Sequence, residues 1–259
     1  MCLTPSLVNG VKVPCRACRI CDDNRVNTWV GRCLAEKQYN KKTYAVTFTY
    51  ADRNSDFDTV SNDWDLKPVH AQQIVYRDFQ LMLKRLRLDY EVRYVVAAEH
   101  GTLRNRVHFH AILFFPGDFP EVDFRNEDGT NKERVFFKYW KHGHCYFDEN
   151  IDWKAFAYTL KYVLKDRKSN SAHNHFAYTT GCKTVGKESP VIGGKFFEDL
   201  AKRYVENGLK PQHWFYQFSD VTNSNGKLKN FYMSGKVRDI FARTYLKLFK
   251  EKYPLDNLP

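Results

Sequence analysis

His108 and His110 lie on either side of a single phenylalanine in the segment Arg106–Phe115, which is rich in β-branched and aromatic residues typical of a strand. Residues two apart in a strand project from the same face, so the two imidazoles become neighbours about 6 to 7 Å apart. Both can then reach one divalent cation. A short loop after Val92–Glu99 predicts an antiparallel pair, which places Glu99 beside the histidines as a third ligand.

His100, His142 and His144 are alternatives for this third ligand. A ligand set with two imidazoles and open positions for water or a phosphate oxygen suits Mn²⁺ or Mg²⁺ catalysis, and its nitrogen content favours Mn²⁺.

A second candidate site lies in the segment Ile151–Lys165, whose apolar residues recur at helical spacing. The apolar face holds Trp153, Phe156, Leu160, Val163 and Leu164. The opposite face holds Tyr158, Lys161, Tyr162 and Lys165. Two phenols one turn apart can attack a phosphodiester in succession, each attack giving a 5′-phosphotyrosyl link and a free 3′-OH. The lysines can neutralise the developing charge. The alternative is a solvated helix face with snorkelling lysines.

Three cysteines follow the pattern CxxCxxC at Cys15, Cys18 and Cys21, and their thiolates can converge on one soft cation such as Zn²⁺. Cys2 is the preferred fourth ligand, because Cys33 falls in a predicted helix, 27–39, whereas the N-terminal segment can fold back. Chance clustering and an iron–sulfur ligand set are the alternatives.

The chain has 259 residues and a formal charge of +11, which favours a polyanionic partner such as nucleic acid. The excess lies near the two ends, with +5 over residues 12–42 and +6 over residues 226–252. The candidate DNA-binding residues are Arg16, Arg19, Lys227, Lys229, Lys236 and Arg238. No apolar run has the length of a membrane span, so we expect no membrane partner. The segment 181–187 spells GxxxxGK, but Glu188 stands where a phosphate-binding loop needs Ser or Thr.

The remaining pattern predicts an α+β fold, with an antiparallel sheet of about five strands covered by helices and an N-terminal Cys-rich knuckle. Further strands are expected at Tyr44–Tyr50, Val135–Trp140, His144–Phe147 and Phe176–Thr180, and further helices at Val69–Leu88, Gly193–Asn207 and Val237–Lys252. The expected organisation is a Cys-rich, zinc-binding segment and helix at 1–40, a domain at 41–225 that holds the histidines and tyrosines, and a basic segment at 226–259 packed on the same domain.

These residues resemble the HUH endonucleases, specifically the two-tyrosine replication initiators of small single-stranded DNA phages. His108-Phe109-His110 is similar to the HUH motif, and Tyr158-Thr159-Leu160-Lys161-Tyr162 is similar to the tyrosine motif that follows it. The strand 44–50 resembles the first family motif, and Glu99 stands where related initiators carry their third metal ligand. The cysteines, the helix 80–87 and the segment 189–193 further resemble initiators of gokushovirus-type members of the Microviridae.

The resemblance implies an HUH-like fold and rolling-circle replication, in which the enzyme nicks single-stranded DNA at a phage origin and later rejoins the ends. It also implies a host helicase and DNA polymerase as partners and a location in the host bacterial cytoplasm. The chain departs from the family pattern after Ser189 and at 230–233, both regions expected to contact DNA. A plasmid initiator, an HUH transposase and a non-catalytic zinc-knuckle nucleic-acid-binding regulator are the alternatives.

Overall fold

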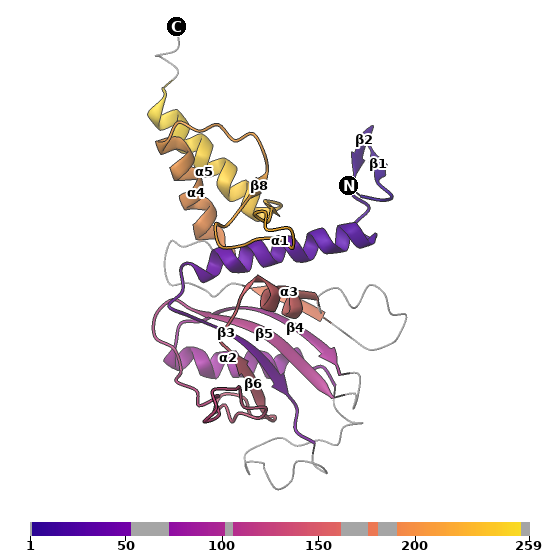
Figure 1. Cartoon of the computed structure of the whole chain (residues 1–259), viewed down its shortest axis with the longest axis vertical. Helices are drawn as coiled ribbons and strands as arrows, with labels where there is room; N and C mark the ends of the chain where they lie inside the picture. Colours follow the sequence, from indigo (N-terminus) through magenta and orange to yellow (C-terminus); the bar gives the residue numbers. More distant parts are fainter. Residues whose placement is uncertain (1, 53–72, 102–105, 162–175, 181–190, 255–259) are drawn as a thin grey trace. The chain divides into compact units, whose positions relative to one another are not determined.

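The computed structural model describes residues 2–52, 73–101, 106–161, 176–180 and 191–254, and its contacts divide the chain into two compact units (Figure 1). Unit 1 combines residues 1–39 with 183–259, and unit 2 comprises residues 40–182. Residues 183–225 group with the two ends of the chain and not with the sheet that holds the histidines.

Unit 2 is built on a five-stranded antiparallel sheet in the order β6-β3-β5-β4-β7. Its strands are β3 (Lys42–Thr49), β4 (Arg93–His100), β5 (Val107–Phe115), β6 (Cys145–Asp148) and β7 (Phe176–Thr180). The hairpin expected from the sequence is present, with Glu99 directly opposite His108 across β4 and β5. The expected antiparallel sheet and mixed α+β class are therefore confirmed.

The two faces of this sheet are covered by different helices. Alternate residues from β3, β4 and β5, including Phe48, Val96 and Phe109, form one core face with α2 (Tyr76–Asp89). The ring of Phe79 from α2 stacks on Phe109, with centroids 5.5 Å apart. Truncating a ring buried to this extent costs about 3 to 5 kcal/mol.

The intervening residues of the same strands form the other face, which α3 (Trp153–Lys161) covers (Figure 1). Phe156 of α3 is fully buried, with its ring centroid 6.4 Å from that of Phe114 on β5. Because Phe114 shares a face with residues 108 and 110 by strand alternation, α3 packs on the face that carries the two histidines.

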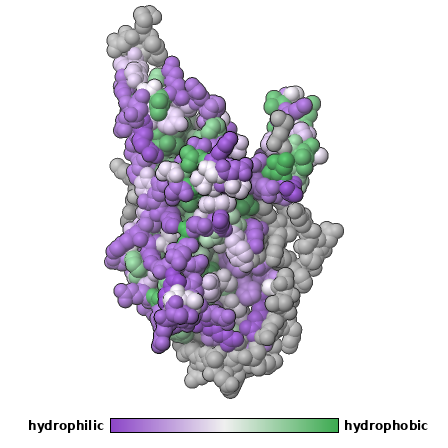
Figure 2. All heavy atoms as spheres, in the orientation of Figure 1, coloured by the Kyte–Doolittle hydropathy of each residue, from purple (hydrophilic) through white to green (hydrophobic). Residues whose placement is uncertain are grey.

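Unit 1 contains three helices among its described residues: α1 (Arg19–Lys37), α4 (Gly194–Glu206) and α5 (Lys236–Lys252). Two short antiparallel pairs accompany them, β1 (Ser6–Val8) with β2 (Val11–Val13) and β8 (Phe215–Tyr216) with β9 (Phe231–Tyr232). Apolar atoms are visible on the surface of the β1–β2 hairpin in Figure 2, where Leu7 and Val11 are exposed.

The start of α4 is fixed to α1 by two hydrogen bonds across a long sequence separation. The Glu36 carboxylate accepts from the backbone N–H of Gly193 at 2.7 Å, and the Arg32 Nε donates to the carbonyl of Ile192 at 3.0 Å. Both acceptors and donors lie in unit 1, so its N-terminal helix and its C-terminal part form one structural body.

Two expectations about local structure are wrong. The first helix begins at Arg19, not at residue 27, because Cys18 takes the extended N-cap conformation and Asp22 follows in the first turn, where an acidic side chain favours the helix start. Residues 135–140 form no strand beyond one isolated bridge, Val135 to Cys145. The Tyr139 carbonyl instead accepts two hydrogen bonds from Arg85, so a side chain and not a neighbouring strand satisfies this carbonyl.

The helix expected over Val69–Leu88 begins at Tyr76 and ends at Asp89, and residues 69–72 lie outside the described residues. None of the described helices combines the length and the apolar character that crossing a membrane requires.

Gly31 of α1 allows the β8–β9 pair to approach the helix closely. A Cβ atom at this position would overlap the Tyr216 hydroxyl and lie 2.8 Å from the Cβ of Phe231. Alanine favours a helix over glycine by about 1 kcal/mol. Overpacking against buried rings costs about 1 to 3 kcal/mol, so we expect Gly31→Ala to destabilise unit 1 despite the gain in helix propensity.

Hydrogen exchange of the α1 amides measures this effect, and Gly117→Ala is the control because a Cβ there meets nothing within 4 Å. Unchanged hydrogen-exchange protection of the α1 amides in Gly31→Ala would show that the close approach of the β8–β9 pair does not contribute to the stability of unit 1.

Candidate metal and nucleophile site

The histidine face of the sheet owes its composition to register. β5 lies between β3 and β4, and directly opposed residues in neighbouring strands share a face. His108 therefore lies between Thr49 and Glu99, and His110 lies between Thr47 and Ala97. Polar and small side chains thus meet on one face, although they come from three segments far apart in the sequence.

Each histidine ring is held by a threonine hydroxyl through the same ring nitrogen. Thr49 Oγ1 lies 3.0 Å from His108 Nδ1, and Thr47 Oγ1 lies 3.2 Å from His110 Nδ1. In the tautomer that carries its proton on Nδ1, each ring donates to its threonine and leaves the lone pair of Nε2 for a cation. Alternation along the strand expected at 44–50 puts both threonines on one face, but their residue type alone assigns them no role.

Glu99 reaches the diagonal histidine, His110, as well as lying directly opposite His108. His110 Nε2 lies 3.1 Å from Glu99 Oε1, and both residues are buried. Two ligands at right angles on one octahedral cation, each about 2.1 Å from it, lie about 3.0 Å apart, which matches this separation. Glu99 therefore suits the third-ligand position that the sequence assigned to it.

His108 approaches this pair less closely. Its ring centroid is 6.2 Å from that of His110, a separation in line with the strand spacing. Burial, together with the nearby charge of His110, lowers the pKa of His108 to about 4, so its ring is neutral at physiological pH. Across the part of the chain that the structure describes, the four cysteines alone form a group of three or more ligand atoms within 4.8 Å of one another.

The other histidines are less well placed for the third position. His142 lies on the core face, where its ring is 4.9 Å from Trp140 and 5.3 Å from Tyr50. His100 follows Glu99 and alternates to the opposite face of β4. His144 shares the face of Thr49, whose N–H donates to the His144 carbonyl, but β3 separates it from β5.

Tyr158 is carried by the helix that covers this same face. Its side chain is 55% exposed, whereas Phe156 and Leu160 on the same helix are buried, as the helical periodicity predicts. The ammonium of Lys161 lies 3.9 Å from the centre of the Tyr158 ring. Tyr162 and Lys165 lie outside the described residues.

The four N-terminal cysteines converge. Cys2 Sγ lies 3.8 Å from Cys18 Sγ, and Cys15 Sγ lies 3.9 Å from Cys21 Sγ. Hydrogen bonds from Thr4 and from the backbone N–H groups of residues 17 and 18 lower the pKa of Cys15 to about 5. Tetrahedral thiolate ligands of one Zn²⁺ are spaced by about 3.8 Å when each bond is about 2.3 Å, so these residues fit zinc.

Cys33, the alternative fourth ligand, is fully buried in α1, and burial raises the pKa of its thiol. It is not a member of the cysteine cluster.

The candidate DNA-binding residues all belong to unit 1. Arg16 and Arg19 follow and flank the first cysteines, and both are exposed. The Lys229 ammonium lies 6.0 Å from the Phe231 ring centre, and the Arg238 guanidinium lies 5.6 Å from that of Trp214. Lys227 and Lys236 are exposed.

Comparison with known proteins gives a family match over the region that holds the histidines. Residues 43–167 match the model of the family described as replication-associated protein ORF2. The chain is 26% identical over 163 residues to the replication-associated protein ORF2 of Spiroplasma virus 4, which covers 59% of this chain and 48% of the relative.

A second relative is the replication-associated protein ORF4 of Chlamydia phage 1, 24% identical over 227 residues, which covers 76% of this chain and 50% of the relative. The chain thus spans about half the length of the curated relatives it matches. No solved structure matches it. The segment that carries Glu99, the two histidines and Tyr158 therefore matches a family of replication-associated proteins, and the similarity to the two viral relatives extends beyond it.

Proposed function

We propose that the chain is a metal-dependent, HUH-type endonuclease and strand transferase that initiates rolling-circle replication of a single-stranded DNA phage. The observation that carries the proposal is the pairing of His110 with Glu99 on the sheet face that the Tyr158 helix covers. The family match over residues 43–167 supports replication as the process in which the site acts.

The chemistry follows from the groups on that face. A divalent cation held by His108, His110 and Glu99 would polarise a non-bridging oxygen of the scissile phosphate. The Tyr158 phenol oxygen forms the new bond to phosphorus, its proton is lost, and the 3′-oxygen leaves and takes up a proton. The products are a 5′-phosphotyrosyl link and a free 3′-OH. Lys161, beside the Tyr158 ring, offsets the negative charge that develops on the phosphate.

The second tyrosine gives the site its capacity to rejoin ends. Tyr162 follows one helical turn after Tyr158 in the sequence, and Lys165 follows Lys161 at the same spacing. A second phenol can cut the displaced strand while the first still holds its 5′ end, and the free 3′-OH then attacks the first phosphotyrosyl link. We propose host helicase and polymerase activities for the synthesis between the two cuts.

The tyrosines give the most direct test. The full chain incubated with origin-containing single-stranded oligonucleotides and Mn²⁺ should form a covalent protein–DNA adduct on a denaturing gel. The double change Tyr158→Phe and Tyr162→Phe should abolish the adduct, because no phenol remains to attack. Tyr232→Phe, which changes an exposed tyrosine of unit 1, is the matched control and should retain it.

An adduct that persists in the double variant contradicts this assignment. No adduct with any oligonucleotide of a broad set would favour the non-catalytic nucleic-acid-binding alternative.

A pair of histidine variants tests whether His110 is a metal ligand and whether the alternative residue His144 is one. His110→Ala should lower the nicking rate by at least about 10²-fold, in keeping with loss of a direct ligand. His144→Ala is the control on the same face and should change it by less than about twofold, because β3 lies between His144 and the metal position. Titration with Mn²⁺ measures both. If His144→Ala lowered the nicking rate as much as His110→Ala, His144 would replace Glu99 as the favoured third ligand.

We also propose a structural zinc ion at Cys2, Cys15, Cys18 and Cys21. The purified chain should hold one zinc per molecule by elemental analysis, and Cys15→Ser should lose it together with the stability of the N-terminal segment. Cys33→Ala should keep the zinc, because that residue lies outside the cluster. A metal-free purified chain, or full zinc content in Cys15→Ser, would refute the site.

A further inference from the structure

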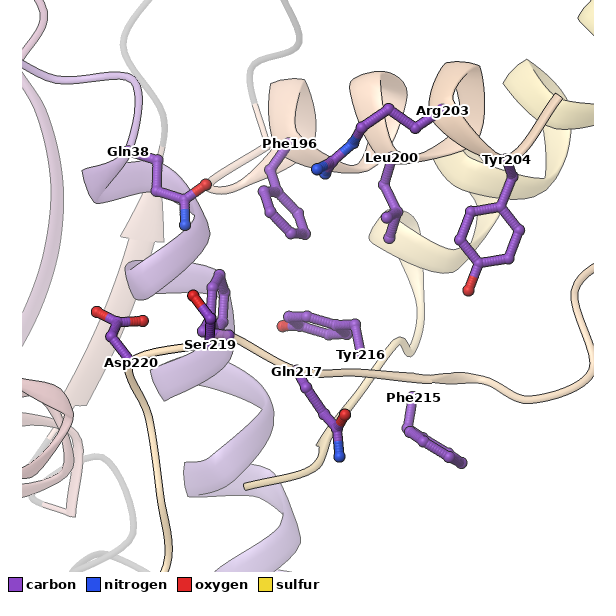
Figure 3. A pocket seen from close by; sticks show the side chains of 11 residues that line it. Gln38, Phe196, Leu200, Arg203, Tyr204, Phe215, Tyr216, Gln217, Ser219 and Asp220 are labelled. Carbon is purple, nitrogen blue, oxygen red and sulfur yellow. The ribbon is translucent and has the colours of Figure 1, made fainter. Parts of the chain in front are cut away.

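A cavity of about 420 Å³ opens in unit 1 between α4 and the segment 215–220 (Figure 3). Four residues on one face of α4 form its first wall: Phe196, Leu200, Arg203 and Tyr204. The facing wall is the segment 215–220, and Gln38 from the end of α1 completes the lining. The volume lies in the range of small-molecule sites, which is about 300 to 1,000 Å³.

The lining of this cavity includes three aromatic rings that are largely buried against one another, Phe196, Tyr216 and Phe218, and one cation at the edge, Arg203. The ring centroid of Phe196 is 5.4 Å from that of Phe218 and 5.8 Å from that of Tyr216. The Arg203 guanidinium lies 5.8 Å from the centre of the Phe196 ring. Aromatic rings and a guanidinium plane are the groups on which nucleic-acid bases stack.

The rim carries side chains that can read the edge of a planar ring. Gln217 points away from α4 and donates to Asn230 at 2.8 Å, whereas Ser219 and Asp220 follow along the same wall (Figure 3). The Asp220 carboxylate accepts hydrogen bonds and repels phosphate. A ligand that presents N–H groups inward and keeps its phosphates outside satisfies both conditions. Adenine, cytosine and guanine present an exocyclic amine with two N–H groups, whereas thymine presents a single N–H, at N3.

The net charge of unit 1 indicates which part of a ligand would lie outside the cavity. Unit 1 holds 20 Lys and Arg against 11 Asp and Glu, a net charge of +9 out of the +11 of the whole chain. Next to the cavity, the ring of His213 stacks on Phe215 with centroids 4.9 Å apart, and Trp214 is 46% exposed beside Arg238. Exposed rings interleaved with cations suit a polyanion that carries bases.

We propose that this cavity is a nucleobase-binding subsite through which unit 1 holds single-stranded DNA. A base with an exocyclic amine enters, packs against Phe196 and Arg203, and donates to Asp220, while its phosphates face the basic surface of the unit. The assignment of the strand as DNA rests on the proposed function, whereas the preference for a base over a phosphate rests on the cavity alone.

Two neighbouring residues of α4 provide a matched test. Arg203→Gln and Lys202→Gln each remove one positive charge from α4, but only Arg203 lines the cavity, while Lys202 pairs with Asp199 at 3.0 Å. Binding of the full chain to fluorescent oligonucleotides of about 12 nucleotides is measured by anisotropy without added divalent cation. We expect Arg203→Gln to weaken oligo-dC binding about fivefold or more beyond Lys202→Gln, the scale of one lost stacking contact.

A second variant separates hydrogen bonding from charge. Asp220→Asn makes unit 1 more positive, so charge alone predicts tighter binding of every oligonucleotide. The subsite predicts instead that the preference of the wild-type chain for oligo-dC over oligo-dT disappears. The melting temperatures of the three variants show whether each is folded.

Equal weakening by Arg203→Gln and Lys202→Gln, no preference for oligo-dC in the wild-type chain, or uniformly tighter binding by Asp220→Asn would each overturn the subsite. The covalent adduct assay is read separately. If the wild-type chain forms the adduct but Arg203→Gln and Lys202→Gln weaken DNA binding equally, only the subsite is refuted. If the two variants differ in DNA binding but no adduct forms, only the nicking function is refuted.

Discussion

The antiparallel register of β3, β5 and β4 is the constraint on which the candidate active site depends. Because side chains alternate along a strand, a shift of one residue in either pairing would turn the threonines or Glu99 away from the histidines and into the aromatic core. The core face secures this register, since Phe48 and Phe109 are fully buried and would be exposed by the same shift. Packing on one side of the sheet therefore maintains the chemistry on the other.

The net charge and the candidate sites are distributed unequally between the two units. Unit 2 carries the histidine face and Tyr158 but has nearly balanced charge, with 21 Lys and Arg against 19 Asp and Glu. Unit 1 carries most of the positive charge, the cysteine cluster and the aromatic cavity. In the proposed mechanism, a near-neutral unit 2 would leave the cation of the histidine face as its main local positive charge, so unit 1 would supply the attraction for the DNA backbone.

Strand alternation and helical periodicity were sufficient to predict much of the site from the sequence. They placed His108 and His110 on one face, brought Glu99 to them through a hairpin, and put Tyr158 opposite the buried face of its helix. Local patterns could not show that the Glu99 carboxylate pairs with Nε2 of His110, because that contact depends on side-chain rotamers within a buried cluster. They also failed at 135–140, where aromatic residues with strand-like composition fill the core from a turn. Local patterns could not predict the cavity of unit 1 either. Its lining combines the end of α1, one face of α4 and the segment 215–220, and no local periodicity links these parts.

Unit 1 is discontinuous in sequence, with the whole of unit 2 inserted between residues 39 and 183. This has a consequence for the order of synthesis and folding. When α1 leaves the ribosome, the partners of its buried face in α4 and β9 are still more than 150 residues away. The cysteine cluster, in contrast, has all four members within the first 21 residues. The N-terminal knuckle can therefore close early, the inserted sheet can fold next as a continuous segment, and α1 must wait with its apolar face uncovered until the last third of the chain emerges.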